Sequence, residues 1–395
     1  MKGSEGKHMK RFILVPVVLA AAVLVAGATL GLGTNAANAE DGHASVLVVS
    51  QHKGVDSATC GTPVAPCATV TQAINNAQPG DTVRVKPGTY HEQVVVPEPI
   101  RLVGYGATID ATGLSQGSGM TMNAAAVLVL GSASGSTIEG LRVQGAYGEG
   151  ILVMRADHVR VAHNTVTGND VGTPATTTYF ECQPQGQVPG DCGEGIHLMS
   201  ATDSRVAGNT VTGNSGGILV TDELGPASGN WISGNFVATN QYDCGITLPS
   251  HNPNALSSGG ARQPTMGGVY GNTVSHNRIF DNGLLGEGAG VLIAASAPGT
   301  ASYDNTVVGN VINGNDLAGV TIHAHAPNQD VSGNVIEDNT IGTNNIGGDP
   351  DAGVSTTTGV LVFSAVVPVT VTINDNHIHG NVTPVWTSSN VTVTN

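Results

Sequence analysis

The stretch GIHLMSATDSRVAGNTVTGNSG, residues 195–216, is one complete period of a repeat that runs from about Gly150 to Asn381. One half of the period reads Gly, then Ile or Val, any residue, and an aliphatic residue. The other half reads Asn, any residue, Val or Ile, two further residues, and Asn. The next period begins at Gly217, 22 residues after Gly195. Self-similarity on this scale is typical of solenoid proteins.

Seven copies of each half alternate along the chain, and insertions lengthen most periods. The glycine phrases begin at Gly150, Gly195, Gly217, Gly245, Gly290, Gly319 and Gly359. The asparagine phrases span Asn164/Asn169, Asn209/Asn214, Asn235/Asn240, Asn277/Asn282, Asn310/Asn315, Asn334/Asn339 and Asn376/Asn381. Each phrase contains two or three alternating apolar residues, which support a short strand and no helix. Gly and Asn at the strand ends suit turns that need a positive φ.

This pattern predicts an all-β solenoid. A coil of about 22 residues holds roughly three short strands with their turns, which fits a parallel β-helix. Equivalent strands would stack about 4.8 Å apart. Each repeated Asn would then lie over the Asn of the neighbouring coil and form an amide ladder. We therefore expect Asn209 to contact Asn235, and the ladder residues to be structural rather than functional.

The N-terminus resembles a secretory signal peptide. An apolar run, Phe12–Gly33, follows Lys10 and Arg11 and precedes the small-residue site Ala37-Asn38-Ala39. We expect cleavage after Ala39, export from the cell, and no membrane attachment afterwards. The apolar run is also long enough for an uncleaved membrane anchor, which is the alternative.

The mature chain, residues 40–395, is expected to be a single domain, because a solenoid grows without needing a second core. Residues 40–80 would form its N-terminal cap region and residues 81–395 its coils. Within the cap, Ala68–Ala77 shows helical spacing of apolar residues. A short helix there would cover the open end of the first coil.

Charge excludes some partners. The formal net charge is −15, and no Lys or Arg follows Arg278. We therefore expect neither nucleic acid nor an anionic membrane surface as a partner. The sequence does not determine the oligomeric state.

The opening coils carry a more specific resemblance. The phrase QPGDTVRVKPGTYHE at residues 78–92, followed by IRLVGYG at residues 100–106, resembles the start of right-handed parallel β-helix proteins of the pectate-lyase-like superfamily. The later phrases resemble the parallel β-helix repeats of that superfamily. The resemblance covers roughly residues 60–395 and implies a right-handed, single-stranded parallel β-helix and a polysaccharide as substrate.

Five cysteines are present in the chain. Export makes disulfides plausible. The local pairings are Cys60 with Cys67 and Cys182 with Cys192, which leaves Cys244 as a buried thiol. Pairing of Cys244 with Cys192 or Cys182 is the alternative, because spacing alone does not settle connectivity.

Polar residues after the glycine phrases form one candidate catalytic group. Asp222 and Glu223 follow one phrase, His251 follows the next, and His323 and His325 follow a later one. An acid beside a His on a loop rim suggests a general acid/base pair. A metal site and ordinary surface residues are the alternatives.

A second group lies at the glycine phrases themselves. Glu149 and Glu194 each precede the Gly of their phrase, so stacked coils would bring the carboxylates together around a Ca²⁺ ion; solvated turn acids are the alternative. His197 would face outward between Ile196 and Leu198, where an oligosaccharide could lie across it. Arg155 would steady a substrate carboxylate or form a turn salt bridge.

Three departures weaken the enzymatic prediction. Lyases of the superfamily neutralise a uronate carboxylate with Arg, Lys or bound Ca²⁺ and use a basic residue to take the proton, but no Lys or Arg occurs after Arg278. The paired-Asp phrases of its galacturonan hydrolases are absent. So is the Asp-Pro-His-Asp phrase of its alginate epimerases, since Leu248-Pro-Ser-His-Asn252 does not match it.

The sequence thus favours two readings of the function. The first is a secreted protein that binds and cleaves or modifies a polysaccharide as a lyase, hydrolase or epimerase. The second is a non-catalytic extracellular glycan-binding or structural protein. A minor third reading is a role in metalloenzyme maturation.

Overall fold

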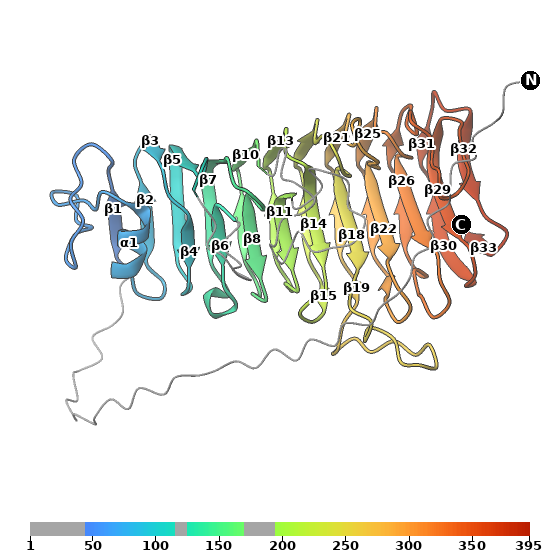
Figure 1. Ribbon diagram of the computed structural model, residues 1–395, viewed down its shortest axis with the longest axis horizontal. Coiled ribbons are helices and arrows are strands. Elements are labelled where there is room, and N and C mark those ends of the chain that lie inside the picture. The colour runs from blue at the N-terminus through green and yellow to red at the C-terminus, as the bar shows by residue number, and fades with distance from the viewer. Residues whose placement is uncertain (1–43, 115–124, 170–193) are drawn as a thin grey trace, which may run out of the picture. The chain divides into compact units, whose positions relative to one another are not determined.

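The computed structural model describes residues 44–114, 125–169 and 194–395. Ala44–Asn395 forms one compact unit, built of coils that stack along a single axis (Figure 1). The expected signal peptide and the Cys182–Cys192 pair lie outside the described residues. The strands of the three sheets pair in parallel, as expected for a β-helix.

A ten-stranded sheet forms one face of the solenoid and contributes one strand from each coil. Its neighbours in order are β4 (Val94–Val96), β6 (Val127–Val129), β8 (Ile151–Met154), β11 (Glu194–Met199), β14 (Gly216–Thr221), β18 (Ile246–Ser250), β22 (Val291–Ala295), β26 (Val320–Ala324), β29 (Thr358–Ser364) and β32 (Thr383–Thr387).

A twenty-stranded sheet forms the other faces as two rows, joined by the long strands β5 (Arg101–Asp110) and β7 (Thr137–Gln144). The first row contains β1 (Val46–Val49), β2 (Thr82–Val85), β9 (Arg160–Ala162), β12 (Arg205–Ala207), β16 (Trp231–Ser233), β20 (Thr273–Ser275), β24 (Thr306–Val308), β27 (Val335–Glu337), β30 (Val369–Asn374) and β33 (Val391–Thr394). The second row contains β3 (Gly88–Tyr90), β10 (Thr165–Thr167), β13 (Thr210–Thr212), β17 (Phe236–Ala238), β21 (Arg278–Phe280), β25 (Val311–Asn313), β28 (Thr340–Ile341) and β31 (His377–Ile378). A small third sheet consists of β15 (Ala227–Ser228), β19 (Val269–Tyr270) and β23 (Ser302–Tyr303).

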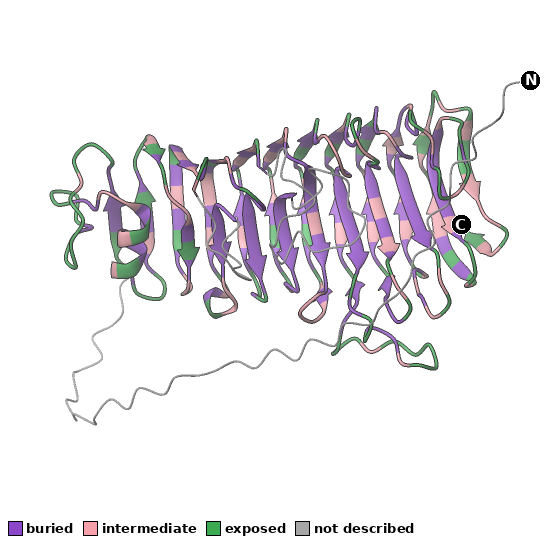
Figure 2. Cartoon of the chain, in the orientation of Figure 1, coloured by how far each residue is buried: buried purple, intermediate pink, exposed green. Residues whose placement is uncertain are grey.

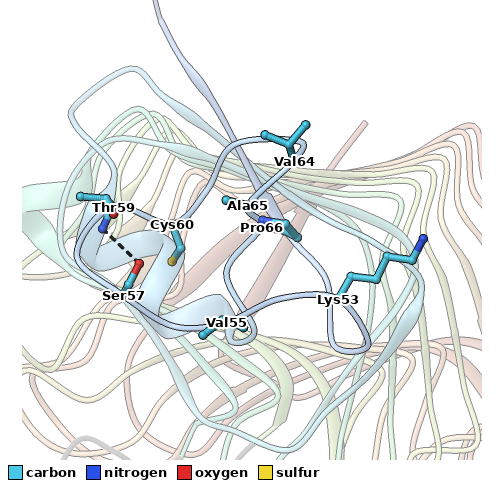
Figure 3. A pocket seen from close by; sticks show the side chains of 8 residues that line it. All are labelled: Lys53, Val55, Ser57, Thr59, Cys60, Val64, Ala65 and Pro66. Atoms are coloured by element: carbon cyan, nitrogen blue, oxygen red, sulfur yellow. Dashed lines mark hydrogen bonds between the residues drawn. The ribbon is translucent and has the colours of Figure 1, made fainter.

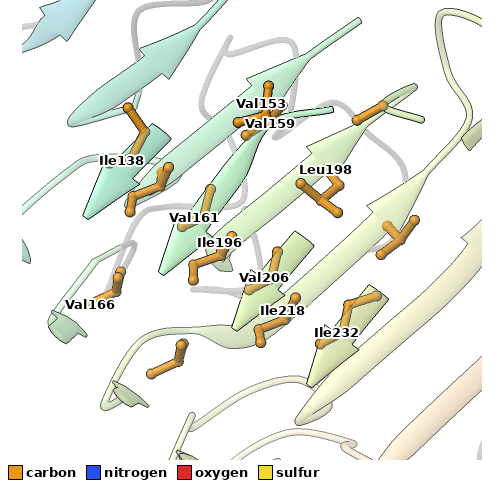
Figure 4. Close-up of a cluster of buried hydrophobic side chains, with 14 of the residues drawn as sticks. Ile138, Val153, Val159, Val161, Val166, Ile196, Leu198, Val206, Ile218 and Ile232 are labelled. Carbon is orange, nitrogen blue, oxygen red and sulfur yellow. The ribbon is translucent and has the colours of Figure 1, made fainter. Parts of the chain in front are cut away.

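Aliphatic side chains from successive coils fill the inside of the solenoid, and most strand residues are coloured as buried in Figure 2. Ile196 and Val206 of one coil are fully buried, and Ile218 and Ile232 occupy the corresponding places in the next coil (Figure 4). Because side chains alternate along a strand, each apolar residue that enters this core leaves its neighbour on the outer face. The outer face of the ten-stranded sheet is where the polar candidates lie.

Asparagine ladders hold the corners of the coils. Nδ2 of Asn209 donates to Oδ1 of Asn235 over 3.0 Å, and the same bond joins Asn164 to Asn209 over 3.1 Å. A second ladder has the same geometry, with Asn214 donating to Asn240 over 3.1 Å. These Asn side chains are buried, so each bond satisfies amide groups that have no access to water. The predicted ladders are confirmed.

The asparagine phrase predicted at Asn334/Asn339 is shifted by one corner of the coil, and a third ladder was not predicted. Asn334 pairs with Asn305 at an earlier corner of the coil, whereas Asn339 belongs with Asn310. The true partner of Asn339 in its phrase is therefore Asn344. The third ladder runs through Asn230, Asn272, Asn305 and Asn334. It was hidden because the Asn residues recur every five positions in these coils, so two phases fit the same pattern.

A short helix, α1 (Val70–Asn76), lies at the N-terminal end, as the spacing of Ala68–Ala77 predicted. Its Val70, Ala73 and Ile74 are buried in the core, so the helix covers the first coil. The carboxylate of Glu92 accepts the backbone N–H of Val70 over 2.9 Å, which satisfies an otherwise unpaired helix donor. Among the described residues no helix is long and apolar enough to cross a membrane.

Candidate functional site

His197 lies on the outer face of the ten-stranded sheet. Its neighbours in β11, Ile196 and Leu198, point into the core, so the alternation predicted from the sequence is confirmed. The side chain is nevertheless buried, because its ring fits between two polar partners. Nδ1 lies 2.8 Å from Oε1 of Glu149, and Nε2 lies 2.7 Å from Oγ1 of Thr221. The ring is therefore not the open sugar-binding surface that the sequence suggested.

The network continues from Thr221 to the surface. The Thr221 hydroxyl donates to Oε2 of Glu223, and Oε1 of Glu223 lies 2.7 Å from Nδ1 of His251. The His251 side chain is 40% exposed and that of Glu223 is 22% exposed. A continuous chain of five side chains from four successive coils thus runs from buried Glu149 to exposed His251.

Both ring nitrogens of His197 lie within hydrogen-bond distance of a side-chain oxygen. The Thr221 hydroxyl has a single proton, and when it donates that proton to Glu223 its oxygen is free to accept from Nε2–H of His197. One hydroxyl therefore links the buried ring to the Glu223 carboxylate.

The exposed pair has an unusual electrostatic state. Burial works to raise the pKa of Glu223, but the hydrogen bond and the charge of His251 outweigh it and bring the pKa to about 2. Burial works to lower the pKa of His251. The hydrogen bond to Glu223 and the charges of Glu223, Asp222 and Asp243 outweigh it and raise that pKa. A proton is therefore held on the imidazole while the carboxylate stays ionised.

Asp222 has a different role from the catalytic one expected. Its side chain is fully buried and accepts four hydrogen bonds. Two come from the backbone N–H groups of His251 and Asn252, over 2.6 Å and 3.1 Å. The others come from the Ser250 hydroxyl, over 2.8 Å, and the Gly268 N–H, over 2.6 Å. Asp222 thus ties together both ends of the loop between β18 and β19 and cannot reach a substrate.

Glu149 and Glu194 come together as the coil spacing predicted, despite the insertion between them. Their carboxylates and a ring nitrogen of His197 all lie within 4.8 Å of one another. Both oxygens of Glu149 already accept protein hydrogens, one of them from the Glu194 N–H over 2.6 Å. Ca²⁺ prefers six to eight oxygen ligands. This donor set, with a nitrogen and an occupied carboxylate, does not fit that ion.

His323 is separate from the Glu223–His251 pair. It lies in β26, two coils beyond β18, and its Nε2 is 2.9 Å from Oδ2 of Asp349. The expected four-residue catalytic group is therefore wrong in extent, because the insertions before β29 supply His323 with its own acid. Arg155 occupies the exposed turn after β8 with a φ of 54°.

The three cysteines that the structure describes agree with the predicted pairing of cysteines that are close in sequence. Cys60 and Cys67 form a disulfide, as predicted. Cys244 is a free buried thiol, also as predicted. Burial, together with the charge of Asp243, raises the pKa of the Cys244 thiol well above its ordinary value, so it is no nucleophile.

The pocket beside the disulfide loop is not part of this site. It has a volume of about 300 Å³ and opens at the N-terminal end of the solenoid (Figure 3). Lys53 is the one charged residue among those that line it: Lys53, Val55, Ser57, Thr59, Cys60, Val64, Ala65 and Pro66. It lacks an acid/base pair, so we do not assign it a catalytic role.

Sequence reasoning missed two parts of the site. Thr221 carries no signal of its own, and only the stacking of β11 on β14 places it between His197 and Glu223. Asp349 and Asp351 lie in an insertion whose path over the sheet no repeat specifies. Register could have found Thr221, since Met199 pairs with it, but it could not have found the two acids.

Comparisons with known proteins agree on the fold. A family model described as "Right handed beta helix region" matches residues 254–395. A second model, described as "Periplasmic copper-binding protein (NosD)", matches residues 181–316. No curated protein matches the chain by sequence.

Solved structures show the same architecture at low identity. The alginate lyase of Paenibacillus sp. str. FPU-7 is 15% identical, with a TM-score of 0.53 over 87% of this chain and 99% of its own. The polygalacturonase of Erwinia carotovora ssp. carotovora is 13% identical, with a TM-score of 0.50 over 92% of this chain and 100% of its own. The active domain of bacteriophage CBA120 tailspike protein 2 is 11% identical, with a TM-score of 0.52 over 82% of this chain and 44% of its own. At these identities the likeness establishes the fold alone.

Proposed function

We propose that this chain, which has the parallel β-helix fold, cleaves a polysaccharide with the Glu223–His251 pair. The two enzymes named above as an alginate lyase and a polygalacturonase act on polysaccharides and share the architecture. The observation that carries the proposal is the 2.7 Å contact between Nδ1 of His251 and Oε1 of Glu223 at an accessible rim.

The chemistry follows from where the proton resides. Hydrolysis of a glycosidic bond adds water to the anomeric carbon, whereas elimination removes a proton from the neighbouring sugar ring to form a double bond. In both reactions the departing oxygen takes up a proton. The raised pKa of His251 means that its ring keeps that proton to a higher pH than an ordinary imidazole does. Its Nε2 has no hydrogen-bond partner among the described residues, so this atom is the one that faces a substrate. Glu223 holds the ring through Nδ1 and stabilises its positive charge.

A panel of polysaccharides tests this proposal. Release of reducing ends or of unsaturated products would identify the cleaved polymer and distinguish hydrolysis from elimination. We expect His251→Ala and Glu223→Gln to lose at least 10²-fold in kcat, the usual worth of general acid catalysis. His377→Ala, at an exposed His on β31, serves as the matched control and should retain full activity. Full activity in both site variants would refute the assignment of this pair.

A second candidate is a glycan-binding protein without catalysis. The twenty-stranded sheet exposes Trp231, at 48%, and Phe236, at 38%, on adjacent faces. Aromatic faces of this kind stack on sugar rings, and the Arg205 guanidinium lies 5.8 Å from the Trp231 ring. Binding without product release, lost in Trp231→Ala and retained in His251→Ala, would favour this candidate.

We also propose that the protein is exported from the cell. The Cys60–Cys67 disulfide forms readily only in an oxidising compartment, which supports the reading of residues 1–39 as a signal peptide. N-terminal sequencing of the protein recovered from the medium or the periplasm should begin at Glu40. Recovery of an intact N-terminus in the membrane fraction would instead indicate an anchor.

A further inference from the structure

His323 and His325 form a pair on the outer face of the ten-stranded sheet. Because they are two residues apart at the end of β26, their side chains point to the same side, while Ala324 between them enters the core. The two rings meet edge to face, with centroids 5.1 Å apart. His323 is nearly buried, whereas the His325 side chain is 40% exposed. One imidazole is therefore fixed and the other remains accessible.

A tight hairpin in the insertion before β29 brings acids to this pair. The backbones of Asp349 and Val354 bond to each other in both directions, over 2.7 Å and 2.9 Å, and the Ala352 N–H donates to Asp349. Val354 and Ala352 pack on Leu361 of β29, so the hairpin lies against the outer face of the sheet. Asp349 and Asp351 are thereby placed beside the two histidines.

Each acid contacts one histidine. Oδ2 of Asp349 is 2.9 Å from Nε2 of His323, and Oδ2 of Asp351 is 3.7 Å from Nε2 of His325. Ligand atoms of His323, His325 and Asp351 all lie within 4.8 Å of one another. Donors bound to one tetrahedral metal at about 2.0–2.1 Å are about 3.3 Å apart. Small side-chain rotations would bring the three onto a single ion.

We propose that His323, His325 and Asp351 bind a divalent transition metal of the Zn²⁺ class. Two imidazoles and one carboxylate, with solvent at the remaining position, are a donor set that such ions favour over Ca²⁺ or Mg²⁺. Asp349 acts as the positioning residue, since a carboxylate on the second nitrogen of a ligating His orients its ring. This site is independent of the carbohydrate activity proposed above.

The surroundings favour a cation at this position. Other carboxylates gather at this end of the sheet, where burial and the charges of Asp351, Asp316 and Asp349 raise the pKa of Glu287. No Lys or Arg follows Arg278 in the sequence, so the later coils supply no competing positive side chain. On the other side, the ring of Phe363 lies 5.7 Å from that of His323 and 5.4 Å from that of His325. The Phe363 ring thus packs against both histidine rings and restricts their movement.

The test is Zn²⁺ binding to the chelator-treated full-length protein by calorimetry, with Ca²⁺ as the comparison ion. We expect a Zn²⁺ site whose affinity falls at least tenfold in His325→Ala and in Asp351→Asn, and no comparable Ca²⁺ binding. The matched control is His377→Ala/His379→Ala, because these two rings are also two residues apart, with centroids 5.2 Å apart, but have no third ligand grouped with them in the described chain.

A second readout separates binding from folding. Co²⁺ in place of Zn²⁺ should give visible absorption bands that disappear in His325→Ala, while circular dichroism of that variant stays unchanged. Equal Zn²⁺ affinity in the wild type, His325→Ala and Asp351→Asn would overturn the proposal. Loss of binding in the His377/His379 variant alone would also overturn it.

Discussion

Asn209 and Asn235, 26 residues apart in sequence, are joined side chain to side chain by a hydrogen bond of 3.0 Å inside the solenoid. Nδ2 of Asn209 also donates to the backbone oxygen of Val161 on the opposite neighbouring coil, over 3.0 Å. One amide therefore connects three consecutive coils. The coils are held together by such corner residues as well as by strand pairing and the apolar core.

Asn235→Ala should lower the free energy of unfolding by about 2–4 kcal/mol. The substitution removes the bond to Asn277 and takes from buried Asn209 the oxygen that accepts both its backbone N–H and one of its amide hydrogens, and an orphaned buried polar group costs about 1–3 kcal/mol. Urea unfolding followed by circular dichroism measures the change. Asn313→Ala, at an exposed Asn on β25, is the control and should stay within about 0.5 kcal/mol of the wild type.

Two Thr→Val substitutions should act in opposite directions. Thr221→Val breaks the link between His197 and Glu223 and should destabilise the protein by about 1–3 kcal/mol. Thr321 is equally buried, but its hydroxyl has no hydrogen-bond partner among the described residues. Thr321→Val should therefore be neutral or stabilising by about 1 kcal/mol. Thermal unfolding of both variants checks the signs, and destabilisation by Thr321→Val would show that the Thr321 hydroxyl does have a hydrogen-bond partner.

The stability contributed by the Glu223–His251 pair should have a pH window with two edges. The pKa of Glu223 falls from 4.5 to about 2 on folding, so its contribution is present above pH 4.5 and is lost as the pH drops toward 2. The pKa of His251 is raised above 6.5, so its contribution is present below that value and is lost as the pH rises through the raised pKa. The difference in unfolding free energy between wild type and Glu223→Gln, measured against pH, should be largest between these edges, at about 1 kcal/mol for a partly exposed pair. A difference independent of pH would show that the pair does not form in solution.

Removing the disulfide should loosen the N-terminal cap. The bridge joins Cys60 and Cys67 across a separation of seven residues, and closing so short a loop is worth about 2–3 kcal/mol in the chain-entropy model. We expect Cys60→Ala/Cys67→Ala to lower the melting temperature and to reduce its sensitivity to reductant. Cys244→Ala is the control, because the buried free thiol takes no part in a bridge and its variant should keep the response to reductant.

The features that depend on the repeat could be predicted from the sequence. The parallel coils, the ladder at Asn209, the outward direction of His197 and the approach of Glu149 to Glu194 all follow from register, since one residue fixes the place of its neighbour a coil away. The path of the insertions was not predictable. Asp349 reaches His323 only because a hairpin folds back over the sheet.

Burial was the other property that the sequence could not show. Asp222 and Glu223 are adjacent and equally acidic, yet the first is buried against four donors and the second faces the rim. Their difference arises because the loop between β18 and β19 wraps around one carboxylate and not the other. The amino-acid composition around Asp222 and Glu223 does not indicate which of the two is buried.

The chain of contacts from Glu149 to His251 restricts how this protein can evolve in length. Elsewhere the ladders make one coil much like another, so a gene duplication that adds a whole turn would find matching partners above and below. Between β8 and β18 the same event would move His197 away from Thr221, or Glu223 away from His251. Relatives that keep these five side chains should therefore vary in coil number only outside this segment.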